Sequence, residues 1–96
     1  MNKNDVIQLL QEHKPHLARV FGVTVLALFG SAARDQLRSN SDIDILVAFD
    51  GPATSMRYFG VQFYLEDLLG RPVDLVTEKA LRQELRPYIE RQVISV

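Results

Sequence analysis

The sequence predicts an α/β (α+β) fold, in which a small mixed β-sheet is covered by helices. Helix-like and strand-like segments alternate along the chain, and the strand-like segments are short and apolar. The chain has 96 residues, of which 47% are hydrophobic and 24% charged, which is an ordinary globular composition. We therefore expect residues 1–96 to form a single domain. The order and direction of the strands do not follow from this pattern.

The first predicted element is a helix that begins after Asn4, a residue type that often caps helices. Apolar side chains follow at helical spacing: Val6, Leu9 and Leu10. Pro15 is expected to interrupt this helix, because proline lacks a backbone N–H, and residues 16–21 are expected to form a further short turn or helix. Gly22 ends the helical region.

Three strands are predicted. Residues 23–29 are rich in β-branched and apolar residues, which is typical of a strand buried on both faces, and Gly30 ends this strand. A second strand over 42–49 is followed by a turn at 50–52. Residues 73–76 form the third strand, which is short.

A long helix is predicted between the second and third strands. Thr54 or Ser55 caps its start, Leu69 is its last residue, and Gly70 terminates it. Its aromatic side chains are expected to pack in the core, with Tyr58 and Tyr64 as alternative partner-surface residues. These aromatic residues are Tyr58, Phe59, Phe63 and Tyr64.

The C-terminal part of the chain has helical character from Ala80 onward. Pro87 is well placed to begin a final short helix, since proline is favoured at the first helical position. Residues 93–96 are expected to be extended.

Charge and composition exclude several classes of function. Eleven Lys and Arg residues against twelve Asp and Glu residues give a net charge of −1, so we expect no strong nucleic-acid binding. The absence of cysteine excludes disulfides and thiolate chemistry. No apolar run approaches the length of a membrane span, so we expect a soluble, cytoplasmic protein without membrane contact.

Two aspartates lie two positions apart in the second predicted strand. Asp42 and Asp44 should therefore share one face, while Ile43 and Ile45 bury the other. Neighbouring carboxylates repel one another, and a divalent cation such as Mg²⁺ relieves that repulsion. The alternative is a strand end at which both carboxylates meet water.

A second candidate feature follows the first strand. At Gly30 and Ser31 a phosphate could approach the backbone N–H groups of a new turn, and the serine hydroxyl adds a donor. Arg34 and Arg38 lie one and two helical turns further on, where they could reach phosphate oxygens. The alternative is a tight turn with two solvated arginines.

Asp74, between Val73 and Leu75 in the third strand, supplies a third carboxylate. If that strand lies beside the second, Asp74 could complete a site for two metal ions. The alternative is an aspartate on an edge strand that faces solvent. A phosphate-binding turn and a carboxylate pair on consecutive strands together match the needs of transfer from a nucleoside triphosphate.

These residues resemble the signature of the polymerase-β-like nucleotidyltransferase superfamily, in which Gly-Ser is followed after ten residues by Asp-x-Asp. The chain is most similar to the minimal nucleotidyltransferases (MNT proteins). The matching residues are Phe29, Gly30, Ser31, Ala33, Arg34, Ser41, Asp42, Asp44 and Asp74. One position departs from the family pattern, because Asp35 stands where the family usually has glycine. That departure puts the local turn and triphosphate affinity in question.

The resemblance implies a polymerase-β-like core and the following roles. Asp42, Asp44 and Asp74 would be catalytic and would bind two Mg²⁺ ions, with Mn²⁺ as an alternative. Asp74 would also be the general base. The nucleotide would be bound by three further residues: Gly30, Ser31 and Arg34.

The family also implies a donor and a partner. MNT proteins often pair with a HEPN-domain ribonuclease toxin as its antitoxin, and some add AMP to a tyrosine of that partner. We therefore expect transfer of a nucleoside monophosphate, AMP from ATP, onto a hydroxyl of a HEPN toxin. The alternatives are an antitoxin that acts by binding alone, a small-molecule nucleotidyltransferase of the aminoglycoside-modifying type, and a binding module without a nucleotide site.

Overall fold

In the described part of the chain, four strands form one mixed sheet in the order β3-β2-β1-β4. The computed structural model describes residues 1–36, 42–80 and 93–96. Within them, the strands are β1 (Val23–Phe29), β2 (Ile43–Phe49), β3 (Val73–Thr77) and β4 (Ile94–Ser95). β1 is antiparallel to both β2 and β4, whereas β2 and β3 are parallel. The three predicted strands are confirmed to within one residue.

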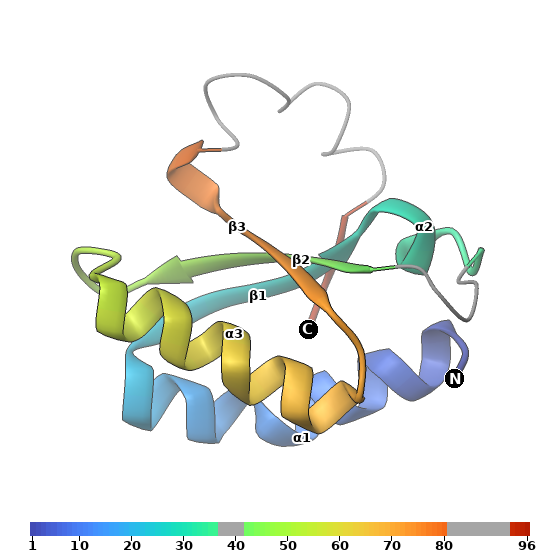
Figure 1. Ribbon diagram of the computed structural model, residues 1–96, viewed down its shortest axis with the longest axis horizontal. Coiled ribbons are helices and arrows are strands. Elements are labelled where there is room, and N and C mark those ends of the chain that lie inside the picture. Colours follow the sequence, from blue (N-terminus) through green and yellow to red (C-terminus); the bar gives the residue numbers. More distant parts are fainter. Residues whose placement is uncertain (37–41, 81–92) are drawn as a thin grey trace.

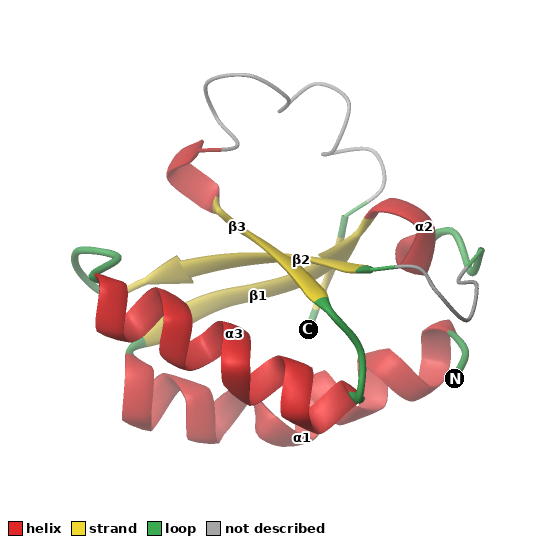
Figure 2. Cartoon of the chain, in the orientation of Figure 1, coloured by secondary structure: helices red, strands yellow, loops and turns green. Residues whose placement is uncertain are grey.

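Two long helices cover one face of this sheet. Both α1 (Lys3–Phe21) and α3 (Ser55–Leu69) lie below the sheet in Figures 1 and 2. The fully buried leucine and isoleucine side chains of this core come from α1, β1, β2 and α3: Leu10, Leu17, Leu26, Leu28, Ile43, Ile45 and Leu65. Val73 and Leu75 extend this core from β3. The predicted fold class is therefore confirmed.

The start of α1 differs from the prediction. Asn2, and not Asn4, is the N-cap: its side chain accepts from the Asp5 N–H at 2.9 Å, and the Asp5 carboxylate accepts from the Asn2 N–H at 3.1 Å. This reciprocal pair satisfies two backbone donors that a helix end otherwise leaves unpaired. The helix consequently begins two residues earlier than predicted.

The predicted interruption at Pro15 is also wrong, because α1 continues without a break from Lys3 to Phe21. Pro15 is exposed, so the carbonyl that it leaves unpaired can be reached by water. Leu10 and Leu17, on either side of the proline, are fully buried, and their packing holds both halves of the helix on the sheet. The predicted end at Gly22 is confirmed.

Pro15→Ala is expected to raise the free energy of unfolding by about 1–3 kcal/mol, because alanine restores one helical hydrogen bond and removes the clash of the proline ring with the preceding turn. Urea unfolding followed by circular dichroism measures this change. Gln11→Ala, also at an exposed position of α1, is the control and should change stability by less than about 0.5 kcal/mol. Equal stability of the proline and alanine proteins would contradict the expectation.

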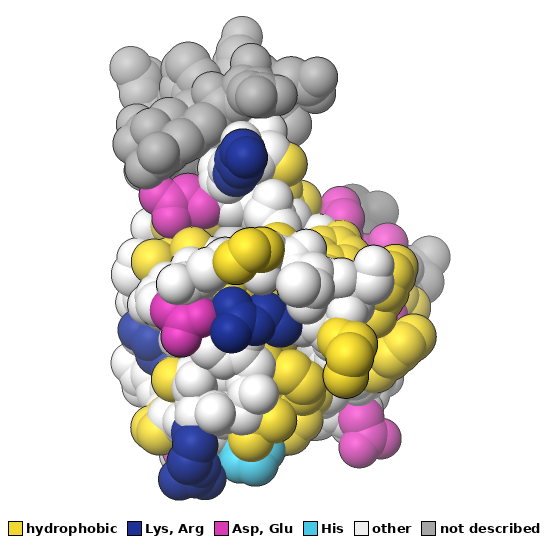
Figure 3. Space-filling model, turned by 90° about the vertical axis from the view of Figure 1, so that its left-hand side faces the viewer, with side chains coloured by type: hydrophobic (Ala, Val, Ile, Leu, Met, Phe, Trp, Pro, Cys, Tyr) yellow, Lys and Arg dark blue, Asp and Glu magenta, His cyan; other side chains and the backbone are white. Residues whose placement is uncertain are grey.

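The ends of α3 agree with the prediction, because Thr54 is its N-cap and Gly70 its C-cap. The predicted burial of its aromatic residues is wrong for Phe59 and Phe63, which are 50% and 65% exposed. Their rings stack on each other, 6.3 Å apart, on the solvent side of the helix. Tyr58 and Tyr64 are half-buried and pack against the core. Hydrophobic side chains are visible on the right of the face in Figure 3, which looks at the molecule from the left of Figure 1.

The remaining predicted elements are described only in part. Residues 78–80 begin a helical turn, in which the Thr77 hydroxyl accepts from the Ala80 N–H at 3.2 Å. The continuation of that helix and the predicted short helix at Pro87 lie outside the described residues. The predicted extended segment 93–96 contains β4, which confirms it. No helix in the described part of the chain is long and apolar enough to cross a membrane.

Candidate active site

Asp44 and Asp74 lie side by side on adjacent parallel strands. They are direct partners in the register of β2 and β3. Because Ile43, Ile45 and the β3 residues beside Asp74 are buried under the helices, both aspartates point to the opposite face of the sheet. The condition set from the sequence, that the third strand lies beside the second, is therefore met.

The charge of Asp44 is strongly influenced by this neighbourhood. The pKa of Asp44 is raised to about 6, chiefly by burial and further by the negative charge of Asp74, a side-chain hydrogen bond to Asp74 and the charge of Asp42. Arg34 opposes it. A shared hydrogen bond between two carboxyl groups requires a proton on one of them, and a cation can take the place of that proton.

Gly30 lies directly against Asp44. Phe29, the last residue of β1, is the register partner of Asp44, and Gly30 follows it with φ +68°. A Cβ atom at position 30 would lie 2.1 Å from Asp44 Oδ2. The glycine of the Gly-Ser pair is thus required by both its backbone conformation and the carboxylate that it touches.

The turn after β1 forms the short helix α2 (Gly30–Ala33). Ser31 is half-buried on this turn and Arg34 is exposed at its end, where its charge acts on Asp44. The first N–H groups of a helix have no partner within the helix, so the turn presents donors beside the acidic pair. Two further sequence candidates, Arg38 and Ser41, lie outside the described residues.

Asp35 adopts the conformation that the family glycine would favour. Its φ is +57°, and its Oδ1 accepts from the Lys3 N–H at 3.0 Å. Lys3 is the first residue of α1, whose start lies below α2 in Figure 1. The carboxylate therefore caps the N-terminus of α1, where a negative charge is favourable.

Asp35→Ala is expected to lower the free energy of unfolding by about 1–2 kcal/mol, because alanine loses the cap and tolerates a positive φ poorly. Asp35→Asn should lower the free energy of unfolding by less, since asparagine adopts this conformation readily and its side-chain oxygen can accept from the same N–H. Thermal unfolding of the three proteins measures the difference. Equal losses in both variants would contradict this account.

Only two of the three predicted aspartates, Asp44 and Asp74, are direct neighbours in the sheet. Asp42 is exposed just before β2, and no group of three or more His, Cys, Asp or Glu side chains in the described ranges is close enough to hold a metal ion unaided. Mg²⁺ commonly takes one or two protein carboxylates and completes its shell with water and substrate phosphates. The Asp44–Asp74 pair fits that requirement, because it offers hard oxygen donors whose mutual repulsion a cation relieves.

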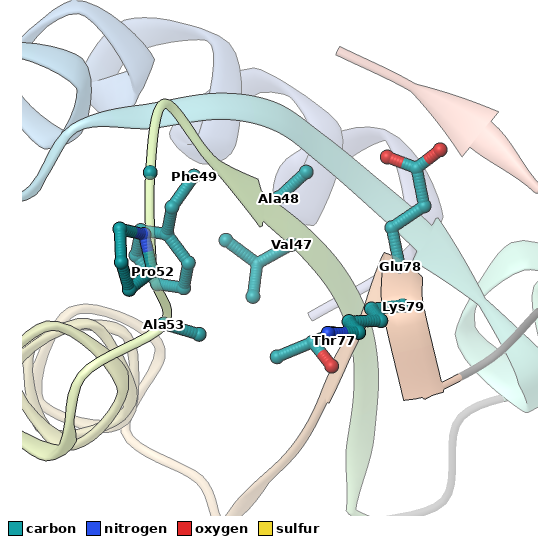
Figure 4. A pocket seen from close by; sticks show the side chains of 9 residues that line it. Val47, Ala48, Phe49, Pro52, Ala53, Thr77, Glu78 and Lys79 are labelled. Atoms are coloured by element: carbon teal, nitrogen blue, oxygen red, sulfur yellow. The ribbon is translucent and has the colours of Figure 1, made fainter.

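An open pocket of about 650 Å³ lies elsewhere on the molecule. It is lined by the end of β2, the loop after it and the residues that follow β3, among them Phe49, Pro52 and Lys79 (Figure 4). The pocket residues Val47 and Thr77 lie three strand positions, or about 10 Å, from Asp44 and Asp74 respectively. The acidic pair is therefore not part of the lining of this pocket.

Sequence reasoning missed the contact between Gly30 and Asp44 and the cap that Asp35 provides. The contact depends on the register of β1 and β2, which is set by packing over the whole sheet. A glycine immediately after an apolar strand was the available signal for close backbone approach. The partner of Asp35 is 32 residues away in the sequence, and no local pattern marks it.

Comparison with known families decides the class of protein. The nucleotidyltransferase domain family matches residues 10–95. The chain belongs to this family. This nucleotidyltransferase is 35% identical to protein adenylyltransferase MntA of Thermococcus cleftensis over 92 residues, which cover 96% of this chain and 93% of that protein.

Solved structures of relatives share this fold. A protein with the provisional name minimal nucleotidyltransferase matches with a TM-score of 0.82 and 33% identity, covering 100% of this chain and 97% of its own. A toxin–antitoxin structure with AMP-PNP matches with a TM-score of 0.64 and 25% identity, over 99% of this chain and 72% of the other. A complex of tri-AMPylated Shewanella oneidensis HEPN toxin with MNT antitoxin, at 22% identity and a TM-score of 0.60, shares the fold; the match covers 97% of this chain and 66% of that one.

Proposed function

We propose that this nucleotidyltransferase moves AMP from ATP onto a hydroxyl of a partner protein, a HEPN-domain toxin, and so acts as its antitoxin. One observation carries the proposal: the Gly30 turn, Asp44 and Asp74 are contiguous across three strands. That arrangement supports phosphate binding beside a carboxylate pair that suits a divalent cation. The name protein adenylyltransferase, carried by MntA at 35% identity, supports a protein acceptor and an adenylyl donor.

Each residue has a role in this reaction. The N–H groups of the turn at Gly30 and Ser31 hold the β- and γ-phosphates, and Arg34 stabilises developing charge. The acceptor oxygen bonds to the α-phosphorus, the bond from that phosphorus to the bridging oxygen breaks, and pyrophosphate leaves. Asp74, the more exposed member of the acidic pair, accepts the hydroxyl proton.

Asp42, Asp44 and Asp74 would hold Mg²⁺, as two ions in the complete site. When bound, Mg²⁺ would neutralise triphosphate charge and favour ionisation of the acceptor hydroxyl. Asp42 needs only a local movement of an exposed side chain to join the pair, because it lies two residues from Asp44 on the same face. A reaction that consumes ATP is expected to take place in the cytoplasm.

The experiment combines the purified chain with the protein encoded beside its gene, ATP and Mg²⁺, and weighs the partner by intact mass spectrometry. We expect a mass gain of one or more AMP groups, released pyrophosphate, and loss of the partner's toxicity in cells. Omitting Mg²⁺, or replacing ATP by GTP, tests the metal and the donor separately. No mass gain in the presence of a toxic partner would contradict the proposal.

The double variant Asp42→Asn, Asp44→Asn separates catalysis from binding. If transfer is the basis of neutralisation, this variant still binds the partner but leaves it toxic. An antitoxin that acts by binding alone predicts that the variant neutralises as well as the wild type.

A further inference from the structure

A line of three polar side chains on α3 contacts the outer edge of β3. Tyr58, Gln62 and Glu66 are spaced four residues apart, so they share one face of the helix. The Tyr58 hydroxyl donates to the Leu75 carbonyl, Gln62 Nε2 donates to the Val73 carbonyl at 3.4 Å, and Glu66 Oε2 accepts from the Val73 N–H at 3.0 Å. We call these three residues the α3 clamp.

The α3 clamp binds the backbone groups on either side of Asp74. The Ile43 N–H donates to the Pro72 carbonyl, so the backbone groups of Pro72 point toward β2. Because these directions alternate along a strand, those of Val73 and Leu75 point outward and those of Asp74 point toward β2. Since β3 is the edge of the described sheet, the outward backbone groups of Val73 and Leu75 have no neighbouring strand to pair with. The side chains of the α3 clamp provide their hydrogen-bond partners instead.

Asp74 is consequently fixed from two sides. The β2 ladder sets its register against Asp44, and the α3 clamp holds the preceding and following residues. The pKa of Tyr58 is raised by burial and further by the charge of Asp74, so the Tyr58 hydroxyl lies within electrostatic reach of the acidic pair.

We propose that the α3 clamp positions the Asp74 carboxylate for cation binding and proton transfer, so that Tyr58, Gln62 and Glu66 are positioning residues of the active site. This inference rests on the proposed function, whose metal and base roles it refines. Its physical basis is that a carboxylate on an edge strand keeps its place only if the free side of that strand is held.

Glu66→Ala tests the proposal against Glu66→Gln. Alanine leaves the Val73 N–H without its acceptor, whereas the glutamine oxygen can accept the same bond. We expect Glu66→Ala to raise the Mg²⁺ concentration for half-maximal transfer on the order of tenfold and to lower kcat, with KM for ATP nearly unchanged. Glu66→Gln should restore both values, and Tyr58→Phe should behave like Glu66→Ala.

Asp67→Ala is the matched control, because it removes an exposed carboxylate from the next position of α3, which does not share the helix face of the α3 clamp. It should leave the Mg²⁺ dependence unchanged. All assays are made well below the unfolding temperature of each variant. The proposal is overturned if Glu66→Ala and Tyr58→Phe lower Tm but keep the wild-type Mg²⁺ dependence and kcat.

A second measurement does not depend on transfer. Binding of Mn²⁺ alone, followed by electron paramagnetic resonance, should be weaker in Glu66→Ala than in wild type and recover in Glu66→Gln. If the wild type binds Mn²⁺ but modifies no partner, the proposed acceptor or donor is wrong and this comparison still decides the role of the α3 clamp. If the wild type binds no Mn²⁺, the α3 clamp has no cation site to position and the inference is overturned.

Discussion

Asp44→Asn is expected to lower the rate of nucleotidyl transfer by a factor on the order of 10³ and, without metal at pH 7.5, to make the protein more stable. The loss of activity follows because an amide is a poor ligand for Mg²⁺ and Asp44 is the most enclosed carboxylate of the site. The gain in stability follows from the electrostatics of the same group. One substitution therefore separates function from stability.

The sign of the stability change follows from the pKa of Asp44, which rises from 3.8 to about 6 on folding. The folded state favours the protonated carboxyl, so this contribution to stability is present below pH 3.8 and is lost as the pH rises through 6. Asparagine is neutral at every pH, so the variant keeps this contribution to stability at high pH. Partial exposure of Asp44 and screening reduce the effect of this higher pKa on stability, and we expect a gain of about 1–2 kcal/mol above pH 7.

Thermal unfolding from pH 4 to pH 8 measures this gain. The advantage of Asp44→Asn should be small near pH 4, increase through pH 6 and then level off. Asp67→Asn removes an exposed carboxylate far from the pair and should show no such step. Excess Mg²⁺ should stabilise the wild type more than the variant, since only the wild type retains both carboxylates of the pair. A gain that is independent of pH would contradict the electrostatic explanation.

Features of the fold that depend on neighbouring residues in the chain could be predicted from the sequence. Short apolar runs predicted all three strands around the site, and the alternation of Asp42 and Asp44 with isoleucines predicted a common face for the two aspartates. That Asp74 lies beside Asp44 could be stated only as a condition, because strand order is decided by packing between segments about 30 residues apart.

The features that sequence reasoning missed depend on distant parts of the chain. Pro15 is tolerated because tertiary packing of Leu10 and Leu17 outweighs one lost hydrogen bond. Phe59 and Phe63 are exposed because their face of α3 points away from the sheet, and periodicity alone does not say which apolar face of a helix the core will use. Sequence patterns therefore located the chemistry, while the packed sheet determined which groups meet.

Gly30→Ala is expected to have the second large effect, which combines backbone strain with direct displacement of a catalytic group. A positive φ costs about 1–2 kcal/mol for a residue with a Cβ atom. That atom would also lie 2.1 Å from Asp44 Oδ2, so the carboxylate or the turn must move. We expect a loss of about 2–4 kcal/mol in stability and a decrease of at least about a hundredfold in transfer rate.

Gly70→Ala provides a matched control for the backbone part of this effect. Gly70 has φ +66°, close to that of Gly30, and no atom lies within 4 Å of the position that its Cβ would take. Gly70→Ala should therefore lose only the strain energy, about 1–2 kcal/mol, and keep its activity. The difference in unfolding free energy between the two variants, measured in urea, isolates the contact at Gly30.

A double-mutant cycle with Asp44→Ala then assigns that contact to a single pair. Truncating Asp44 removes the oxygen that the new methyl group would meet, so Gly30→Ala should be less destabilising in the Asp44→Ala background than in the wild type. In the Asp44→Ala background, the loss of unfolding free energy caused by Gly30→Ala should fall to about the loss caused by Gly70→Ala. An unchanged cost would mean that the turn, and not the carboxylate, resists the methyl group. In that case Gly30 would serve the backbone conformation alone.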